Sequence, residues 1–90
     1  MTIYAFVLIN SEVGQENKLI PELKIINNVS EVALVLGLYD IVVKLEADNV
    51  QKLENSVTEI RKLPGIKSTL SMMTTPHEEL LRSSNPYGCD

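Results

Sequence analysis

Two apolar stretches near the middle of the chain are separated by very few residues, and this spacing constrains the fold more than any other feature. They are VSEVALVL at 29–36 and DIVVKLEA at 40–47, with Gly37 to Tyr39 between them. Alternation of apolar and polar residues in the second stretch is typical of a strand with one more apolar face. A connection this short joins antiparallel neighbours. The pattern therefore predicts a central β-hairpin.

The first part of the chain predicts a strand followed by a helix. Residues 3–10 (IYAFVLIN) form a continuous apolar run whose length fits a strand covered on both faces. From about residue 15 to 26, apolar residues then recur at helical spacing. Pro21 conflicts with a simple helix because it lacks an N–H and clashes with the preceding turn. We expect a helix that starts late, near Lys18, or one that is kinked, and that ends at Asn27-Asn28.

The part of the chain after the hairpin repeats this order in reverse. Asp48 is the expected N-cap of a second helix, with Gln51 completing a capping box. Apolar residues at steps of three and four continue to Leu63, and Pro64-Gly65 ends the helix. Residues 66–73 are predicted to form the last strand.

The order of elements is therefore β-α-β-β-α-β. It predicts an α+β, ferredoxin-like fold, with a four-stranded antiparallel sheet and two helices on one face. The opposite face is expected to carry Phe6, Leu8, Val42 and Leu70 or their neighbours. Because an uncovered apolar sheet face in water implies a partner, we expect a dimer formed through this face.

Composition narrows the classes of function. The chain has 90 residues and a formal net charge of -4, so we expect one domain that makes no direct contact with nucleic acid. The first residues lack the basic region of a signal peptide, and no apolar run is long enough to span a bilayer. These features predict a soluble, cytoplasmic protein without a membrane partner. Cys89 is the only cysteine, so no internal disulfide is expected.

Three segments together resemble the effector-binding domain of the Lrp/AsnC (feast/famine) regulators, also called the RAM domain. The segments are AFVLIN at 5–10, GLYDIVVKLEAD at 37–48 and IRKLPGIKSTLS at 60–71. They contain a G-x-Y-D turn before an apolar strand with an internal lysine, a helix that ends in K-x-P-G-I, and a hydroxyl-rich last strand. The resemblance covers roughly residues 3–74.

The resemblance implies a regulatory domain that forms assemblies and is not an enzyme. Full-length members begin with a helix-turn-helix domain, whereas here the first strand begins almost at Met1. A stand-alone member, of the kind best known in archaea, is therefore expected. Residues 1–74 would form the ligand-binding domain, and 75–90 a tail with a helical turn or two before a loose end. The family also implies dimers that pair into octamers or larger rings, and a full-length Lrp/AsnC regulator as a further partner.

The family's ligands are amino acids or related small molecules bound in clefts between dimers. The matching positions here are Gly37, Tyr39, Asp40, Ser68, Thr69 and Ser71. Asp40 is suited to the ammonium group, and the hydroxyls of Thr69 and Ser71, or free backbone N–H groups, are suited to the carboxylate. Gly37 permits close approach of the backbone, and Tyr39 supplies an apolar wall with a polar tip.

Plainer interpretations of these residues remain open. Asp40 also suits a turn in which it hydrogen-bonds its own backbone, Gly37 suits the turn conformation alone, and the hydroxyls suit an ordinary strand face. A small dimeric ferredoxin-like barrel enzyme, and an assembly protein without a ligand, are the alternative functions. His77 is the only histidine and stands in a polar tail, so no metal, cofactor or catalytic base is predicted.

The chain departs from the family pattern around its first helix. Pro21 stands where a plain helix former is usual, and Asn27-Asn28-Val29 replaces a common Pro-Gly-Val. The segment 76–90 has no clear counterpart in the family. The first two departures fall on the first helix, which borders the cleft in the family.

Overall fold

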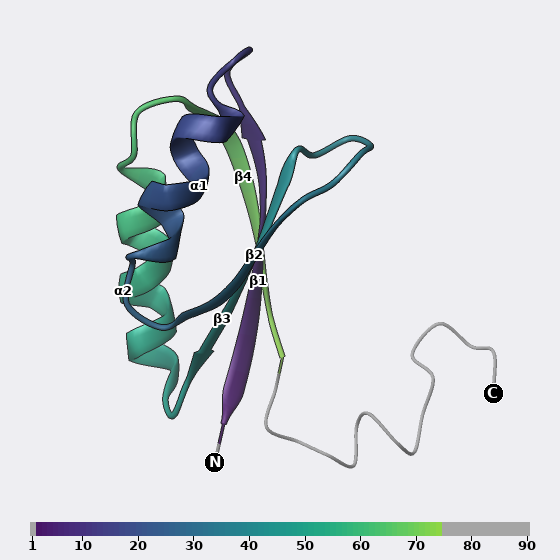
Figure 1. Ribbon diagram of the computed structural model, residues 1–90. Helices are drawn as coiled ribbons and strands as arrows, with labels where there is room; N and C mark the ends of the chain where they lie inside the picture. Colours follow the sequence, from purple (N-terminus) through teal and green to yellow (C-terminus); the bar gives the residue numbers. More distant parts are fainter. Residues whose placement is uncertain (1, 75–90) are drawn as a thin grey trace, which may run out of the picture.

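The computed structural model describes residues 2–74 and shows the expected order of strands and helices (Figure 1). The elements are β1 (Ile3–Ser11), α1 (Glu16–Lys24), β2 (Val29–Leu34), β3 (Ile41–Ala47), α2 (Val50–Arg61) and β4 (Ile66–Met73). The predictions for residues 75–90, His77 and Cys89 lie outside the described residues.

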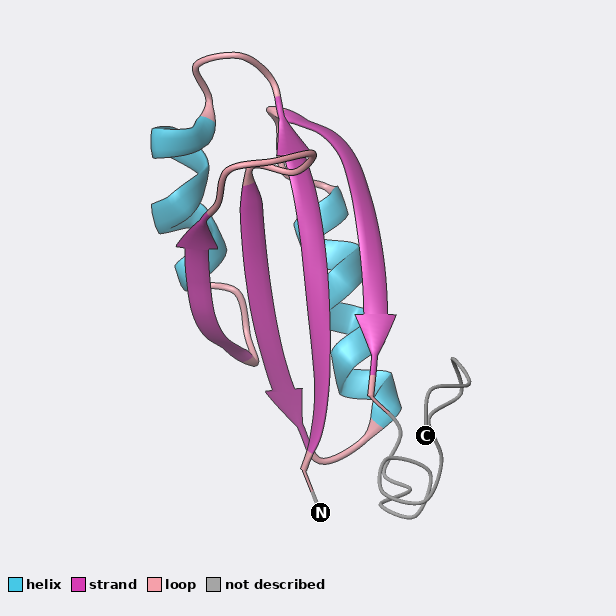
Figure 2. Ribbon diagram, turned by 90° about the vertical axis from the view of Figure 1, so that its right-hand side faces the viewer, coloured by secondary structure: helices cyan, strands magenta, loops and turns pink. Residues whose placement is uncertain are grey.

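The strands form one antiparallel sheet in the order β2-β3-β1-β4 (Figure 2). Strands β3 and β1 are central, and β2 and β4 are the edges. Both helices lie on the same face of the sheet (Figure 1). The α+β ferredoxin-like prediction is therefore confirmed for the arrangement of strands and helices.

The core lies between the helices and one face of the sheet. Alternate residues of β1 point into it, and the residues between them are only half-buried. The core consists of Ile3, Ala5, Val7, Ile9, Leu19, Leu23, Ile41, Val43, Leu45, Leu53, Val57 and Ile60. The expectation that β1 is covered on both faces is therefore not met within the described chain, because helices cover only one face.

Helix α1 begins earlier than the proline suggested. It starts at Glu16, with Gln15 as the N-cap residue, and Pro21 lies inside the helix. The expected late start near Lys18 is therefore wrong. The helix ends at Lys24 with Ile25 as the C-cap residue, so the expected end at Asn27-Asn28 is also wrong. Asn28 adopts the left-handed conformation with φ of 73° in the turn that leads into β2.

The N-cap of α2 is Asn49 and not the predicted Asp48. Asn49 has an extended backbone, and its side-chain oxygen accepts a hydrogen bond from the backbone N–H of Lys52 at 2.9 Å. The capping geometry requires the helix to begin at the next residue, and α2 begins at Val50. Asp48 instead forms an ion pair with Lys52 at 3.0 Å, and this hydrogen bond lowers the pKa of the Asp48 carboxyl.

The connection between β2 and β3 is longer than predicted. β2 ends at Leu34 and β3 begins at Ile41, so 35–40 form a loop. The backbone N–H of Val35 donates to the carbonyl of Asp40 at 2.8 Å, and the N–H of Asp40 donates to the carbonyl of Ile9 at 2.9 Å. Val35 and Leu36, which the sequence pattern placed in the strand, therefore belong to the loop.

Candidate functional site

The β2–β3 loop is attached firmly to β1 through Asp40. Oδ2 of Asp40 accepts hydrogen bonds from the backbone N–H of Ser11 at 2.9 Å and from its hydroxyl at 3.1 Å. Ser11 is buried at the end of β1. The side chain of Asp40 thus bonds to a residue 29 positions away, in addition to the backbone bonds of Asp40 to Val35 and Ile9.

The tip of this loop extends away from the helix side of the sheet (Figure 1). Leu36 is fully exposed and Leu38 is largely exposed, so the tip presents apolar side chains to the surroundings. Gly37 has φ of 144°, which side-chain-bearing residues rarely adopt, and there is open space where a Cβ would lie. The loop therefore needs glycine for its conformation, and the space beside Gly37 also leaves its backbone accessible.

The hydroxyl residues of β4 lie on two different faces of the sheet. Ser68 pairs with Asn10 and accepts a hydrogen bond from its side-chain amide at 3.3 Å. Thr69 and Ser71 pair with Ile9 and Val7, which face the helices. The alternation of a strand separates Ser68 from the other two. Within one chain, the residues predicted to bind a ligand are therefore not brought into one pocket.

Arg61 is a candidate binding residue that the sequence analysis missed. Its Nε donates to the hydroxyl of Thr69 and its terminal NH2 group donates to that of Ser71, both at 3.3 Å. It forms no ion pair with another described residue. The short turn from α2 into β4, together with the strand alternation of Thr69 and Ser71, was the signal that could have identified this cluster. An exposed guanidinium beside two hydroxyls is suited to binding a carboxylate.

The sheet face opposite the helices is the second feature of interest, and it is called the open face below. It carries Tyr4, Phe6, Leu8, Val42, Leu70 and Met72. Leu70 and Met72 are 46% and 49% exposed. Phe6, Leu8, Val42 and Leu70 thus lie on the predicted face. The Lys44 ammonium lies 4.8 Å from the centre of the Tyr4 ring and marks the polar margin of this face.

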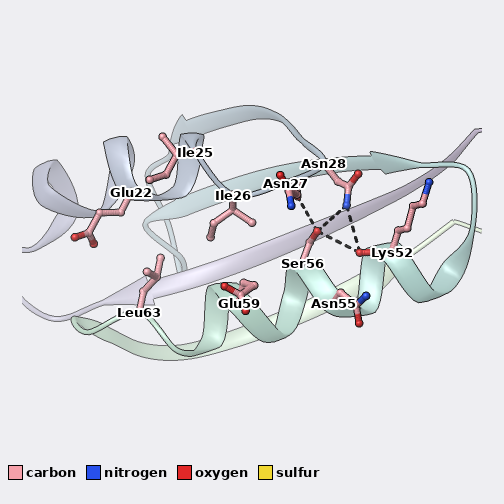
Figure 3. Close-up of a pocket in the computed structure, with 10 residues that line it drawn as sticks. All are labelled: Glu22, Ile25, Ile26, Asn27, Asn28, Lys52, Asn55, Ser56, Glu59 and Leu63. Atoms are coloured by element: carbon pink, nitrogen blue, oxygen red, sulfur yellow. Dashed lines mark hydrogen bonds between the residues drawn. The ribbon is translucent and has the colours of Figure 1, made fainter.

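A groove of about 740 Å³ lies on the helix side, between the end of α1 and α2 (Figure 3). It is lined by Glu22, Ile25, Ile26, Asn27, Asn28, Lys52, Asn55, Ser56, Glu59 and Leu63. None of the residues predicted from sequence to bind a ligand lines it. No periodic or motif signal in the sequence distinguishes these residues from an ordinary helix surface, so sequence reasoning could not find the groove.

Residues 2–74 present neither a cluster of metal ligands nor a membrane-spanning helix. In this part of the chain, no group of three or more His, Cys, Asp or Glu side chains is placed to hold a metal ion. No helix in the same range is long and apolar enough to cross a membrane.

A family model and the solved structures point to the same family of domains. A model of the Lrp/AsnC ligand binding domain matches residues 4–80. The crystal structure of FFRP-DM1 is similar, with 35% identity, a TM-score of 0.75, and coverage of 81% of this chain and 99% of that one. The hypothetical protein PHS023 from Pyrococcus horikoshii has 33% identity, a TM-score of 0.76, and coverage of 86% and 94%.

A more distantly similar structure is a complex with a ligand. It is the feast or famine regulatory protein from M. tuberculosis complexed with L-methionine, with 22% identity and a TM-score of 0.68. The match covers 84% of this chain but 52% of that regulator, and at this identity it shows the fold alone. A search among curated proteins found no significant match.

Proposed function

The chain belongs to the Lrp/AsnC ligand-binding domain family, and from this premise we propose that it senses an amino acid or a related small metabolite. The ligand would bind at a cleft between subunits and change the assembly or its stability. The M. tuberculosis regulator that shares this fold binds L-methionine, which supports an amino acid as the class of ligand. Regulation of transcription would then proceed through a full-length Lrp/AsnC regulator as partner.

The hydrogen bonding of the Asp40 carboxylate is the single observation on which this proposal rests. Both hydrogen bonds that its side chain accepts within the described chain go to Oδ2, which leaves Oδ1 open. A carboxylate that is fixed in orientation and retains one oxygen for a donor is well suited to an ammonium group. Gly37 and Tyr39 precede Asp40 in the same loop and are the proposed neighbours of the ligand.

The carboxylate of the ligand would be bound by the hydroxyls of β4 and by Arg61. Strands β3 and β4 lie on opposite sides of β1, so their backbones are roughly 10 Å apart. The ammonium and carboxylate of an α-amino acid are attached to one carbon atom and cannot span this distance. We therefore place Asp40 of one subunit opposite Thr69, Ser71 and Arg61 of another, with Ser68 contacting the ligand or the neighbouring subunit from the open face.

Dimerisation through the open face is the assembly step that this site requires first. The apolar part of the face is formed by Phe6 and Leu8 of β1, Val42 of β3, and Leu70 and Met72 of β4. Removal of its exposed leucine and methionine side chains from water is favourable. Octamers or larger rings built from such dimers would create the clefts between dimers. Contact with nucleic acid is not part of this proposal.

The experiment is a measurement of mass in solution by light scattering, with and without each of the twenty amino acids, together with thermal melting. We expect an assembly larger than a dimer that changes in size or melting temperature with a small subset of amino acids. In Asp40→Asn, the assembly should persist and this response should be lost. Glu12→Gln, which removes a charge from the exposed β1–α1 connection, is the control and should keep the response.

The alternative of an assembly protein without a ligand has one observation in its favour. The hydrogen bonds that Asp40 accepts from Ser11 give this aspartate a structural role that needs no ligand. If no amino acid changes the size or the melting temperature of the assembly, this structural task is sufficient and the sensor proposal fails.

A further inference from the structure

The loop between β2 and β3, residues 35–40, overhangs one end of the open face and is called the arm below. Figure 1 shows the arm leaving the sheet on the side opposite the helices. Seen from that side, the arm passes in front of the end of β1 (Figure 2). A molecule large enough to cover the open face therefore lies against the arm as well.

The apolar surface of the arm extends that of the open face. Ala33 pairs with Val42 of the open face, and strand alternation places Val35 on the same side as Ala33. Beyond Val35, Leu36 is fully exposed and Leu38 is 88% exposed. A single exposed leucine is common on protein surfaces, but two at one loop tip next to an apolar sheet face indicate an interaction surface.

The base of the arm is fixed by hydrogen bonds before any partner binds. The backbone N–H of Val35 donates to the carbonyl of Asp40 at 2.8 Å, and the N–H of Asp40 donates to the carbonyl of Ile9 at 2.9 Å. The Asp40 carboxylate holds the same end of the arm to Ser11. A loop that is already ordered loses little conformational entropy when its tip is buried in an interface.

The charged residues of the open face favour a second copy of this chain as the partner. Lys44 and Glu31 pair with each other across β2 and β3, and Glu46 pairs with Tyr4, so this face carries both signs of charge. Among residues 2–74, none of these three charged side chains belongs to an ion pair. A face with both signs is complementary to its own copy, whereas an anionic membrane would require an excess of positive charge.

We propose that the arm clasps the subunit that covers the open face, with Leu36 and Leu38 of each copy packed against the other copy. The contact is isologous, so it occurs twice in one dimer. This inference rests on the open-face dimer of the proposed function. It needs no amino-acid ligand, and it therefore concerns the ligand-free protein.

The test measures dissociation of the ligand-free dimer of the full chain. Cys89 is the only cysteine and takes a donor or an acceptor dye. Energy transfer in a dilution series gives the dissociation constant, and mixing of the two labelled pools gives the rate of subunit exchange when the dimer is too tight to dilute apart. Leu36→Ser and Leu38→Ser should each raise the dissociation constant by about tenfold or more, because each removes a leucine side chain that the interface buries.

Ile25→Ser is the matched control. Ile25 is 82% exposed at the end of α1, on the helix side of the sheet, and its replacement should change the dissociation constant less than about twofold (Figure 3). The amide NMR signal of Ser11 should keep its position in both arm variants. That signal reports whether the base of the arm is intact, so a weaker dimer is then not a consequence of a disordered loop.

Four results would overturn the proposal. They are a monomeric parent protein, an unchanged dissociation constant and exchange rate in the double variant, an equal effect of Ile25→Ser, and intact dimers whose larger assembly alone breaks down. The last result would mean that the arm contacts a copy in another dimer. None of these measurements uses an amino acid, so failure of the sensor proposal, which is a missing amino-acid response, is recognised independently.

Discussion

Oδ2 of Asp40 accepts two hydrogen bonds from Ser11, one from its backbone N–H at 2.9 Å and one from its hydroxyl at 3.1 Å. The first of these satisfies the N–H of a buried residue at the end of a central strand. The same side chain that the family resemblance assigns to a ligand therefore also closes the fold. Oδ1 accepts neither bond, and it is the oxygen that we propose for the ligand.

Removal of this carboxylate should destabilise the protein. In Asp40→Ala, the buried N–H of Ser11 loses its partner, and the free energy of unfolding should fall by about 1–3 kcal/mol. Ser11→Ala keeps that N–H bonded and removes only the hydroxyl bond, so its loss should be smaller, about 0.5–1.5 kcal/mol. Urea unfolding at one fixed protein concentration measures both values, since assembly makes stability depend on concentration.

The informative result is which of the two variants, Asp40→Ala or Ser11→Ala, loses more stability. If Ser11→Ala is as damaging as Asp40→Ala, the hydroxyl and not the backbone N–H is the important donor. If neither variant differs from the parent protein, the loop does not depend on this contact, and Asp40 is free to serve a ligand with both oxygens.

The sequence allowed the order of elements to be predicted because apolar periodicity reports directly which faces are buried. The alternation in β3 and the stripe of α2 are examples, and both elements lie close to their predicted positions. The capping residue of α2 was misassigned by one position because Asp48 and Asn49 are both good caps. Only the backbone decides which of them is extended and which N–H lies within reach.

The site was less predictable for a physical reason. Asp40, Thr69 and Ser71 are identifiable as residue types, but their partners Ser11 and Arg61 are determined by the register of β1 and β4. A shift of one residue would exchange Ser68 for Thr69 on the helix face. The groove at Glu22 depends on the spacing of two helices, for which the sequence carries no local signal.

The corrected assignment of the α2 cap can be tested by paired substitutions. Asn49→Ala removes the acceptor for the Lys52 N–H, which should cost about 1 kcal/mol of stability. Asp48→Ala removes an exposed ion pair, which should have a much smaller effect in 0.15 M salt. Thermal or urea unfolding compares the two, and a larger loss from Asp48→Ala would contradict the cap assignment.

The pH dependence of the Asp48 pair has a definite sign. Because Lys52 lowers the pKa of Asp48 in the folded protein, the small contribution of this pair is present above the unfolded pKa of aspartate. It is lost as the pH falls through the lowered folded pKa. Unfolding curves of the parent and of Asp48→Asn should therefore converge in acid, and a difference that grows with acidity would contradict this.

The hydroxyl of Ser56 should be a sensitive position on α2. It is buried and contacts Asn28, the carbonyl of Asn27 and the carbonyl of Lys52. Ser56→Ala removes the hydroxyl from all three of these contacts and leaves the part-buried Asn28 amide with only its 3.4 Å hydrogen bond to the carbonyl of Lys52, so it should lower stability by about 1–2 kcal/mol. Thr58→Ala is the control, because this exposed hydroxyl also donates to a carbonyl one turn earlier. Its effect should be within about 0.5 kcal/mol, and similar losses in both variants would rule out a special role for the Ser56 hydroxyl.

The last prediction concerns the proposed dimer interface. Leu70 stands in the open face beside Leu8, and Leu70→Glu would place a carboxylate within the proposed interface. Burying an unpaired charge is far more costly than the association can offset, so the mass measured by light scattering should fall to that of a monomer.

Val13→Glu is the matched control for this change. Val13 is 96% exposed in the connection between β1 and α1, away from the open face, and the same apolar-to-acid change there should leave the mass unchanged. Both variants should keep the far-ultraviolet circular dichroism of the parent, since Leu70 does not belong to the core. If Leu70→Glu keeps the parent mass while Val13→Glu does too, the subunits associate through another surface. The clefts that bring Asp40 near Arg61 would then have to be built from different neighbours.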